Sequence, residues 1–160
     1  MRSEQEANRA IELYSDTVRR ICMVHLKSYS DTEDIFQTVF LKYVLSSATF
    51  ESEEHEKAWL IRVTINACKD YLKSFFKSRV FSSDDIAKLA GGAKSGNSDV
   101  LEAVLSLPKK YKDPVYLHYY EGYSAEEIGR ILGRNTNTVY TLLSRAKGLL
   151  KKELGGDDFE

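Results

Sequence analysis

The chain has 160 residues, of which 42% are hydrophobic and 29% are charged, and its formal net charge is −1. This composition allows globular cores and is too balanced in sign for a disordered polyelectrolyte. No apolar run approaches the roughly 18 residues of a membrane span, and the polar N-terminus does not resemble a signal peptide, so we expect a cytoplasmic protein without membrane insertion.

The first helical pattern runs to about Leu26. Apolar side chains recur there every three or four residues, which predicts an amphipathic helix with one face in a core. This face comprises Ile11, Tyr14, Val18, Ile21, Cys22 and Leu26.

A second helix is predicted to begin at Ser30 or Asp31. Either residue can cap it, and the carboxylates of Glu33 and Asp34 in its first turn favour the helix dipole. Its apolar stripe comprises Ile35, Phe36, Val39, Phe40, Tyr43 and Val44. We therefore expect this helix to share the core of the first.

A third helix is predicted from about Lys57 to Lys77, and it has two distinct faces. The expected core face comprises Leu60, Ile61, Thr64, Ala67, Cys68, Tyr71, Leu72 and Phe75. The opposite face comprises Trp59, Arg62, Asn66, Lys69, Lys73 and Lys77. Basic side chains can hold phosphates, and an aromatic ring can stack an unpaired nucleobase. An ordinary solvated face with a Trp that partly covers the core fits the pattern equally well.

Residues 82–99 are rich in Ser, Gly and Asp, the composition of a flexible linker. Everything on either side has a helical period. We therefore predict an all-α fold of two small helical domains, residues 1–80 and 99–160, joined by a flexible linker over residues 81–98.

The second domain is predicted to open with two short helices. The first begins near Val100 and stops at Pro108. The second runs from about Asp113 to Glu121, with Pro114 in its first turn, where a missing N–H group costs nothing. Gly122 is expected to end it.

A helix-turn-helix is predicted next. Ser124 and Glu127 have the spacing of a capping box, and Gly133 suits the left-handed residue that ends a short helix. Asn135 or Thr136 can cap the following helix, which runs to about Leu154. This arrangement places a second helix in a DNA major groove.

The last helix has a buried and a polar face. The buried stripe comprises Val139, Leu142, Leu143, Ala146 and Leu150. The candidate DNA contacts are Asn135, Asn137, Thr138, Tyr140, Thr141, Ser144, Arg145 and Lys147. Asn and Arg can read base edges and Lys can hold phosphates. The alternative is a helical hairpin with a solvated polar face.

The near-neutral net charge conceals a strong asymmetry. Residues 31–56 hold seven acids and one base, residues 57–79 six bases and one acid, and residues 130–152 six bases and no acid. Separated basic segments predict two places that meet phosphates.

The two cysteines, Cys22 and Cys68, are too few for a disulfide framework and lack CxxC spacing, so we expect reduced core residues. Cys22 and His25 could share a metal ion, but no second pair completes a site. We predict no metal and no cofactor. An enzyme, such as a recombinase with a Tyr or Ser nucleophile, is disfavoured because no Arg/His cluster accompanies any of the ten tyrosines.

Three segments resemble the sigma-70 family of bacterial RNA polymerase sigma factors. Asp31 to Phe40 is similar to its DxEDxxQxxF signature, and Ala58 to Leu72 is similar to the AWLxRIAxNxxxDxxR segment that follows. Leu107 to Lys147 resembles the fourth domain of the family. Two such domains without a third between them are typical of the extracytoplasmic-function (ECF) type.

The resemblance implies a role for each segment. Asp31, Asp34, Gln37, Phe40 and Leu41 would bind core RNA polymerase. The loop over residues 46–56 would hold the melted minus-ten strand together with Trp59, Arg62, Asn66, Lys69 and Lys73. The last helix would read the minus-thirty-five duplex, and the linker would enter the RNA exit channel. An anti-sigma factor is an expected further partner.

Two features depart from the family pattern. Tyr140 and Leu142 occupy positions where the family often has basic residues. The acids Glu51, Glu53, Glu54 and Glu56 repel DNA, which predicts that only a few loop residues contact the promoter. The alternative function is a stand-alone helix-turn-helix transcription regulator, which leaves the Asp31–Phe40 and Trp59–Asp70 patterns unexplained.

Overall fold

The computed structural model describes the backbone of residues 1–78 and 99–154 and the side chains of residues 1–74 and 103–153. Within these ranges the regular structure consists of seven α-helices, which confirms the predicted all-α class. The chain divides into two units between Lys94 and Ser95, and each is described by itself. The predicted flexible linker, residues 81–98, lies outside the described residues.

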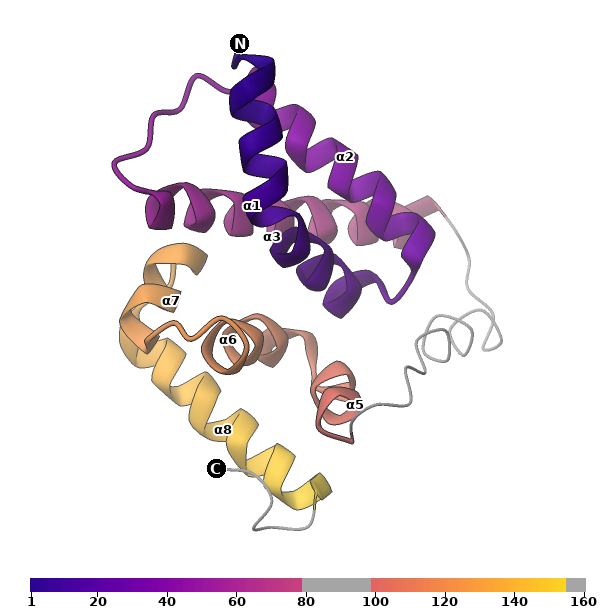
Figure 1. Ribbon diagram of the computed structural model, residues 1–160. Helices are drawn as coiled ribbons and strands as arrows, with labels where there is room; N and C mark the ends of the chain where they lie inside the picture. Colours follow the sequence, from indigo (N-terminus) through magenta and orange to yellow (C-terminus); the bar gives the residue numbers. More distant parts are fainter. Residues whose placement is uncertain (79–98, 155–160) are drawn as a thin grey trace. The chain divides into compact units, whose positions relative to one another are not determined.

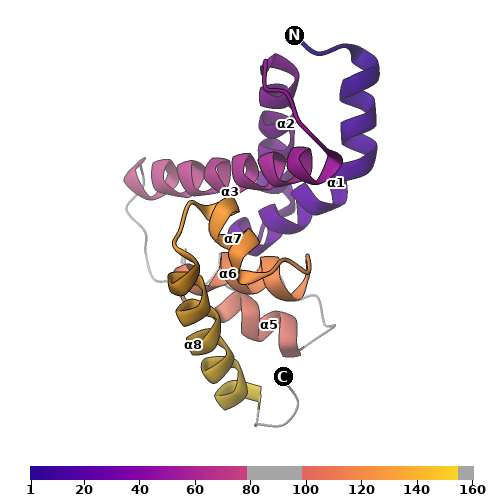
Figure 2. The same ribbon diagram turned by 90° about the vertical axis from the view of Figure 1, so that its left-hand side faces the viewer.

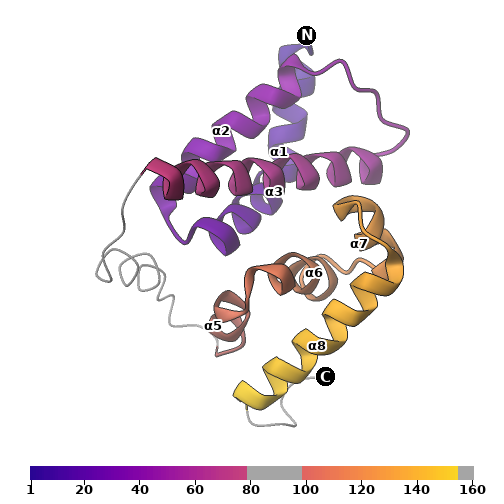
Figure 3. The same ribbon diagram turned by 180° about the vertical axis from the view of Figure 1, so that it is seen from behind.

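Unit 1 contains α1 (Glu4–Leu26), α2 (Tyr29–Leu45) and α3 (Glu53–Ser78), and each helix packs against the other two. α1 and α2 lie side by side and α3 crosses them (Figures 1 and 3). The Ser3 hydroxyl accepts the N–H of Glu6 and caps α1. Lys27, in the left-handed conformation at φ 53°, ends it.

α2 and α3 both begin earlier than predicted. The hydroxyl of Ser28, not Ser30 or Asp31, caps α2 by accepting the N–H of Asp31 at 3.3 Å. The left-handed turn at Lys27 leaves Ser28 extended, as an N-cap requires. α3 begins at Glu53, and the carbonyl and hydroxyl of Ser52 accept the first N–H groups of this helix.

Among the side chains that the structure describes, the predicted faces of the three helices lie in or against the core of unit 1 with one exception, and Phe75 lies outside the described side chains. Ile11 is 36% exposed, whereas Ala10 is fully buried, because the packed stripe at this end of α1 passes through Ala10 and Tyr14. The buried core cluster comprises Ala10, Tyr14, Val18, Cys22, Leu26, Ile35, Val39, Phe40, Tyr43, Leu60, Ala67 and Cys68.

Cys22 and Cys68 are buried and not joined by a disulfide, as predicted, and their Sγ atoms lie 3.8 Å apart between α1 and α3. No three His, Cys, Asp or Glu side chains are grouped to hold a metal ion among the residues that the structure describes. No helix in the described part is long and apolar enough to cross a membrane.

Unit 2 contains α5 (Asp99–Ser106), α6 (Lys109–Tyr119), α7 (Ala125–Leu132) and α8 (Thr136–Leu154). The long helix α8 packs against the other three (Figure 2). One core cluster of unit 2 consists of buried residues of α5, α6 and α8 together with Leu107, which follows α5: Ala103, Val104, Leu107, Tyr111, Val115, Ala146 and Leu150.

α6 differs from its prediction at both ends. It begins at Lys109, directly after Pro108, so Pro114 lies inside the helix and not in its first turn. A proline there removes one internal hydrogen bond. The helix ends at Tyr119, and Gly122, at φ 77°, lets the chain turn toward α7.

Candidate nucleic-acid and protein-binding surfaces

One face of α2 combines polar and apolar side chains that are exposed to solvent. Asp34, Gln37 and Leu41 follow one another at helical spacing, and Leu41 is 59% exposed. Leu45, one turn further and 62% exposed, extends this face, which we call the α2 face. Sequence reasoning missed Leu45 because an apolar residue at a helix end gives no sign of its exposure.

Two of the residues expected on this face lie elsewhere. Phe40 is 5% exposed and packs in the core, with its ring 4.8 Å from that of Phe36. It therefore contributes to the helix packing and presents little surface to a partner. Asp31 is half-buried at the start of α2.

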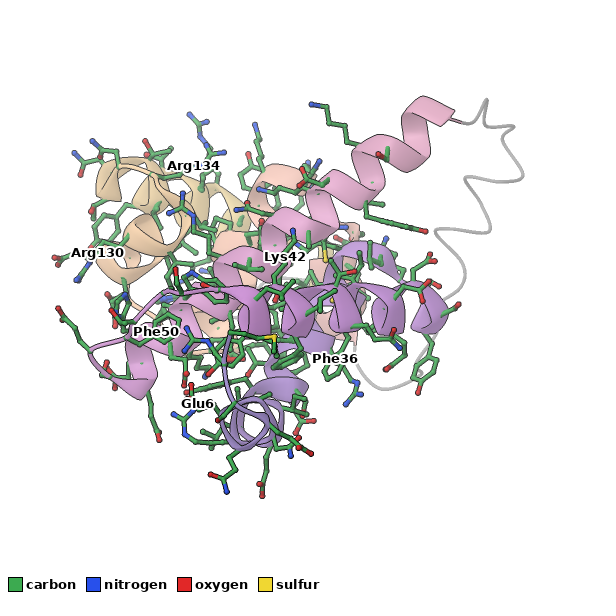
Figure 4. All side chains as sticks on the ribbon, turned by 90° about the horizontal axis from the view of Figure 1, so that it is seen from above. Glu6, Phe36, Lys42, Phe50, Arg130 and Arg134 are labelled. Atoms are coloured by element: carbon green, nitrogen blue, oxygen red, sulfur yellow. The ribbon has the colours of Figure 1, made fainter. Side chains whose placement is uncertain are left out.

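Three aromatic rings gather where the segment between α2 and α3 meets the helices. The ring of Phe50 stacks nearly parallel to Tyr43 at 6.4 Å and meets Trp59 edge-on at 5.7 Å. Trp59 is half-buried and also contacts Tyr43 at 6.1 Å. Phe50, labelled in Figure 4, thus fixes the segment 46–52 to both helices. The two readings of Trp59, as a base platform and as a cover of the core, are compatible in this position.

Glu56 lies beneath this cluster and is 5% exposed. Its carboxylate accepts hydrogen bonds from Arg9 at 2.9 Å, Tyr14 at 3.0 Å and Tyr43 at 2.7 Å. Burial raises the pKa of Glu56, but these hydrogen bonds outweigh burial, and the net pKa is below the ordinary value. Burial and the bond to Glu56 raise the pKa of Tyr43.

The predicted acidic loop is therefore less acidic at its surface than the sequence indicates. Glu56 is enclosed and paired, so it cannot repel DNA as predicted. Glu51, Glu53 and Glu54 remain exposed. Their position before and within the first turn of α3 favours the dipole of that helix.

The basic face of α3 is arranged as predicted. Arg62, Asn66 and Lys73 are exposed on successive turns, and Lys69 lies half-buried between them. Lys77 belongs to the part of α3 whose side chains are outside the described residues. These four side chains form a row that can follow the phosphates of one nucleic-acid strand. The aromatic cluster of Tyr43, Phe50 and Trp59 lies at the N-terminal end of this row, where it could stack a nucleobase.

In unit 2, α7 and α8 form the predicted helix-turn-helix. The Ser124 hydroxyl accepts the N–H of Glu127 at 3.1 Å, and the Glu127 carboxylate accepts the N–H of Ser124 at 3.0 Å, which completes the capping box. Hydrogen bonds from the Ser124 backbone and side chain lower the pKa of Glu127. Gly133, at φ 67°, ends α7 as predicted.

The turn between α7 and α8 is tight. The N–H of Arg134 donates to the Gly129 carbonyl at 2.8 Å, and a Cβ atom on Gly129 would lie 2.7 Å from the Arg134 carbonyl oxygen. Gly129 therefore sets the approach of the two helices, a role that its place inside a helical pattern did not reveal.

The outer face of α8 carries most of the predicted DNA contacts. Asn137, Thr138, Tyr140, Thr141, Ser144 and Arg145 are exposed, and Lys147 is half-buried. Tyr140 is 61% exposed. The predicted stripe of Val139, Ala146 and Leu150 is fully buried, with Leu142 and Leu143 packed beside it.

Asn135 has a structural role. Its Oδ1 accepts the N–H of Asn137 at 2.8 Å, which caps α8 and engages the oxygen that a base contact would use. Arg130 on α7 and Arg134 in the turn that follows are exposed cations (Figure 4). They were counted in the basic segment but not predicted as site residues.

The fold and these surfaces define an all-helical protein with a DNA-binding helix-turn-helix in one unit and a basic, aromatic-capped helix in the other. Residues 10–75 match the family described as Sigma-70 region 2, and residues 98–150 match Sigma-70, region 4.

Curated relatives agree with this class. RNA polymerase sigma factor SigV of Bacillus subtilis is 33% identical over 141 residues, which cover 87% of this chain and 85% of that protein. ECF RNA polymerase sigma factor SigW of the same species is 23% identical over 90% of this chain and 86% of that protein. The chain belongs to the sigma-70 family of RNA polymerase sigma factors and is of the ECF type.

Two solved structures share the fold at 18% sequence identity. The sigma factor RpoE, in complex with the anti-sigma factor NepR from Bartonella quintana, has a TM-score of 0.74 and covers 96% of this chain and 99% of its own. CnrH, in complex with the cytosolic domain of CnrY, has a TM-score of 0.69 and covers 98% and 92%.

Proposed function

We propose that this sigma factor divides promoter recognition between its units: unit 1 docks on core RNA polymerase and captures the opened minus-ten strand, and unit 2 reads the minus-thirty-five duplex. The observation that carries the proposal is the gathering of positive charge on α3 and α8 in a chain whose net charge is −1.

The α2 face is the proposed polymerase contact. Asp34 and Gln37 supply polar groups, and Leu41 and Leu45 supply apolar area that has no cover in unit 1. Exposed leucines one turn apart, rimmed by polar groups, are typical of a protein interface. Phe40 supports this face from the core.

The segment 46–52 and the α3 face are the proposed single-strand site. Trp59 and Phe50 offer aromatic surface, and Arg62, Asn66, Lys69 and Lys73 offer polar and basic groups along the next turns. Each stacked base contributes about 1–3 kcal/mol, which helps to offset the cost of strand opening.

The α8 face is the proposed duplex reader. The residues on this face would divide the work: Asn137 and Arg145 would read base edges, Lys147 would hold the backbone, and the exposed hydroxyls of Thr138, Thr141 and Ser144 would contact bases or phosphates. Arg130 and Arg134 add phosphate contacts beside the turn. Each bidentate base contact contributes about 1–3 kcal/mol of discrimination.

Regulation and location follow by analogy with the relatives. RpoE and CnrH are each held by a protein partner, NepR and the cytosolic domain of CnrY, respectively. We infer that an anti-sigma factor covers surfaces of this chain in the same manner, that the chain acts in the cytoplasm with RNA polymerase, and that it catalyses no reaction of its own.

Transcription in vitro tests the proposal. Core polymerase from the source organism is combined with the chain and a fragmented genomic library, and the transcripts are sequenced. Initiation at sites that share two elements, one at minus ten and one at minus thirty-five, supports the proposal. Tight, sequence-specific promoter binding by the free chain, with no effect of polymerase, would instead identify a stand-alone regulator.

A further inference from the structure

Arg2 contacts the segment between α2 and α3 through a side chain that is largely buried. Its side chain is only 13% exposed. Its backbone N–H donates to the Val44 carbonyl at 2.9 Å, and its Nε donates to the Tyr43 carbonyl at 3.0 Å. These carbonyls belong to the last turn of α2, where orphan acceptors and the helix dipole both favour a cation.

The same guanidinium reaches into the middle of the segment. One Nη atom donates to the carbonyl of Ala48. The planar group also lies over two aromatic rings, 4.5 Å from the centre of Tyr43 and 5.1 Å from that of Phe50. Arg2 therefore holds the end of α2, the middle of the segment and the aromatic cluster together.

Glu56 is linked to Arg2 through Tyr43. Tyr43 lies with its ring under Arg2 and its hydroxyl on Glu56, 2.7 Å away. The segment 46–52 is thus fixed at Ala48 by a cation, at Phe50 by ring contacts and at the start of α3 by a buried anion. Ser47, Thr49 and Glu51 alternate with these anchors and stay exposed.

We propose that Arg2 is a positioning residue that pre-shapes the segment 46–52 for capture of an unpaired promoter base. The inference rests on the proposed single-strand role of this segment. A loop ordered before binding loses less entropy on binding, so its affinity is higher without a new contact to the ligand. Arg2 acts through Ala48, Tyr43 and Phe50 and touches no DNA itself.

Arg2→Ala and Arg2→Lys test the proposal in the full chain. Lysine keeps the charge but cannot make two directed bonds while lying flat on two rings. Arg20→Ala is the matched control because it removes a guanidinium from an exposed position of α1. Hydrogen exchange of peptides over residues 46–52 should accelerate about tenfold in Arg2→Ala, partly in Arg2→Lys and not in the control.

The functional readout uses holoenzyme and a single-stranded oligonucleotide with the minus-ten sequence that wild type selects. Arg2→Ala should bind this strand about tenfold more weakly, which corresponds to about 1.4 kcal/mol, while its affinity for core polymerase is unchanged. An abasic scan then identifies the position at which wild type loses most. On that abasic strand Arg2→Ala and wild type should bind equally, because the two changes remove the same interaction.

The outcomes separate this inference from the function on which it rests. If wild-type holoenzyme starts transcription but Arg2→Ala binds the strand as wild type does, the role of Arg2 is wrong and the function stands. If Arg2→Ala loses strand and core polymerase affinity together, or keeps its deficit on the abasic strand, Arg2 only stabilises the fold. If wild-type holoenzyme does not initiate, the proposed function fails first.

Discussion

The carboxylate of Glu56 joins the three helices of unit 1. It lies on α3 and accepts hydrogen bonds from Arg9 and Tyr14 on α1 and from Tyr43 on α2. A buried charge is costly unless it is fully paired, and these three donors supply that pairing. The interaction therefore stabilises the junction from which the segment 46–52 emerges.

Glu56→Gln should destabilise unit 1 by about 2 kcal/mol at pH 7, because a neutral amide replaces the carboxylate, which weakens the hydrogen bonds that the charge strengthened and turns one acceptor oxygen into a donor. The folded-state pKa of Glu56 is below its ordinary value of 4.5. Its contribution is therefore fully present above that value and is lost as the pH falls through the lower folded pKa. The difference between wild type and Glu56→Gln should be constant above about pH 5 and shrink below pH 4.

Urea unfolding followed by the fluorescence of Trp59 measures this difference. Trp59 is the single tryptophan of the chain and contacts Tyr43, so it reports on unit 1. Glu53→Gln is the matched control because Glu53 is 71% exposed one turn away. A difference between Glu56→Gln and wild type that persists unchanged into acid would show that the charge of Glu56 is not the stabilising feature.

The structural role of Glu56 could not be predicted from the sequence. The sequence places it in a run of acids and predicts a surface that repels DNA. Its partners Arg9, Tyr14 and Tyr43 lie 13 or more positions away. Only the packing of three helices brings these residues together, so no local sequence pattern predicts the contact.

At the scale of elements, the α7–α8 turn is set by a glycine that has no room for a side chain. Gly129→Ala would place Cβ against the Arg134 carbonyl, so the turn must shift, at a cost of about 2 kcal/mol. Gly148→Ala, on exposed α8 with no atom within 4 Å of the added Cβ, should stabilise its helix by about 1 kcal/mol. Hydrogen exchange of the α7 and α8 amides in the full chain measures both. Equal effects of the two changes would contradict this role of Gly129.

The α2 face supplies a second prediction for an element. Leu41→Ala and Leu45→Ala should each weaken binding to core polymerase by about 1 kcal/mol or more, because they remove apolar area from the proposed polymerase interface. Their folding stability should change little, since both leucines are already exposed. Titration with labelled core polymerase measures the affinity. Leu13→Ala, which removes a 48% exposed leucine from α1, is the control and should bind as wild type does.

Element type was more predictable than element boundaries. Helical spacing and the capping box identified the described helices because these signals are local. The boundaries of α2, α3 and α6 shifted because these helices begin directly after Ser28, Ser52 and Pro108, two to four residues before their predicted starts. Helical spacing placed Phe40 in the core stripe and offered Asn135 as a cap, and the structure confirms both. The enclosure of Glu56 and the anchoring by Arg2, in contrast, depend on neighbours that periodicity does not specify.

At the scale of the whole molecule, segregated charge explains how a chain with a net charge of −1 can act on DNA. A neutral total gives weak long-range attraction, so the free chain should bind duplex DNA only in the micromolar range or more weakly, at about 10⁻⁶ M or above. Under the proposed function, we expect the basic faces to contribute once polymerase holds both units near the promoter, because tethering raises their effective concentration.

Two substitutions on α8 distinguish recognition of the base sequence from binding of the phosphate backbone. Lys151→Gln removes an exposed cation from the last turns of α8 and should weaken holoenzyme binding to every duplex alike, lowering the slope of log affinity against log salt by about 1. Arg145→Ala should lower the preference for the selected minus-thirty-five sequence over a scrambled one by about tenfold, as the loss of a bidentate base contact does. Salt titrations on both duplexes measure the two quantities. If Arg145→Ala leaves the preference intact and changes only the slope, Arg145 holds the backbone, and discrimination must come from Asn137 and the hydroxyl-bearing residues beside it.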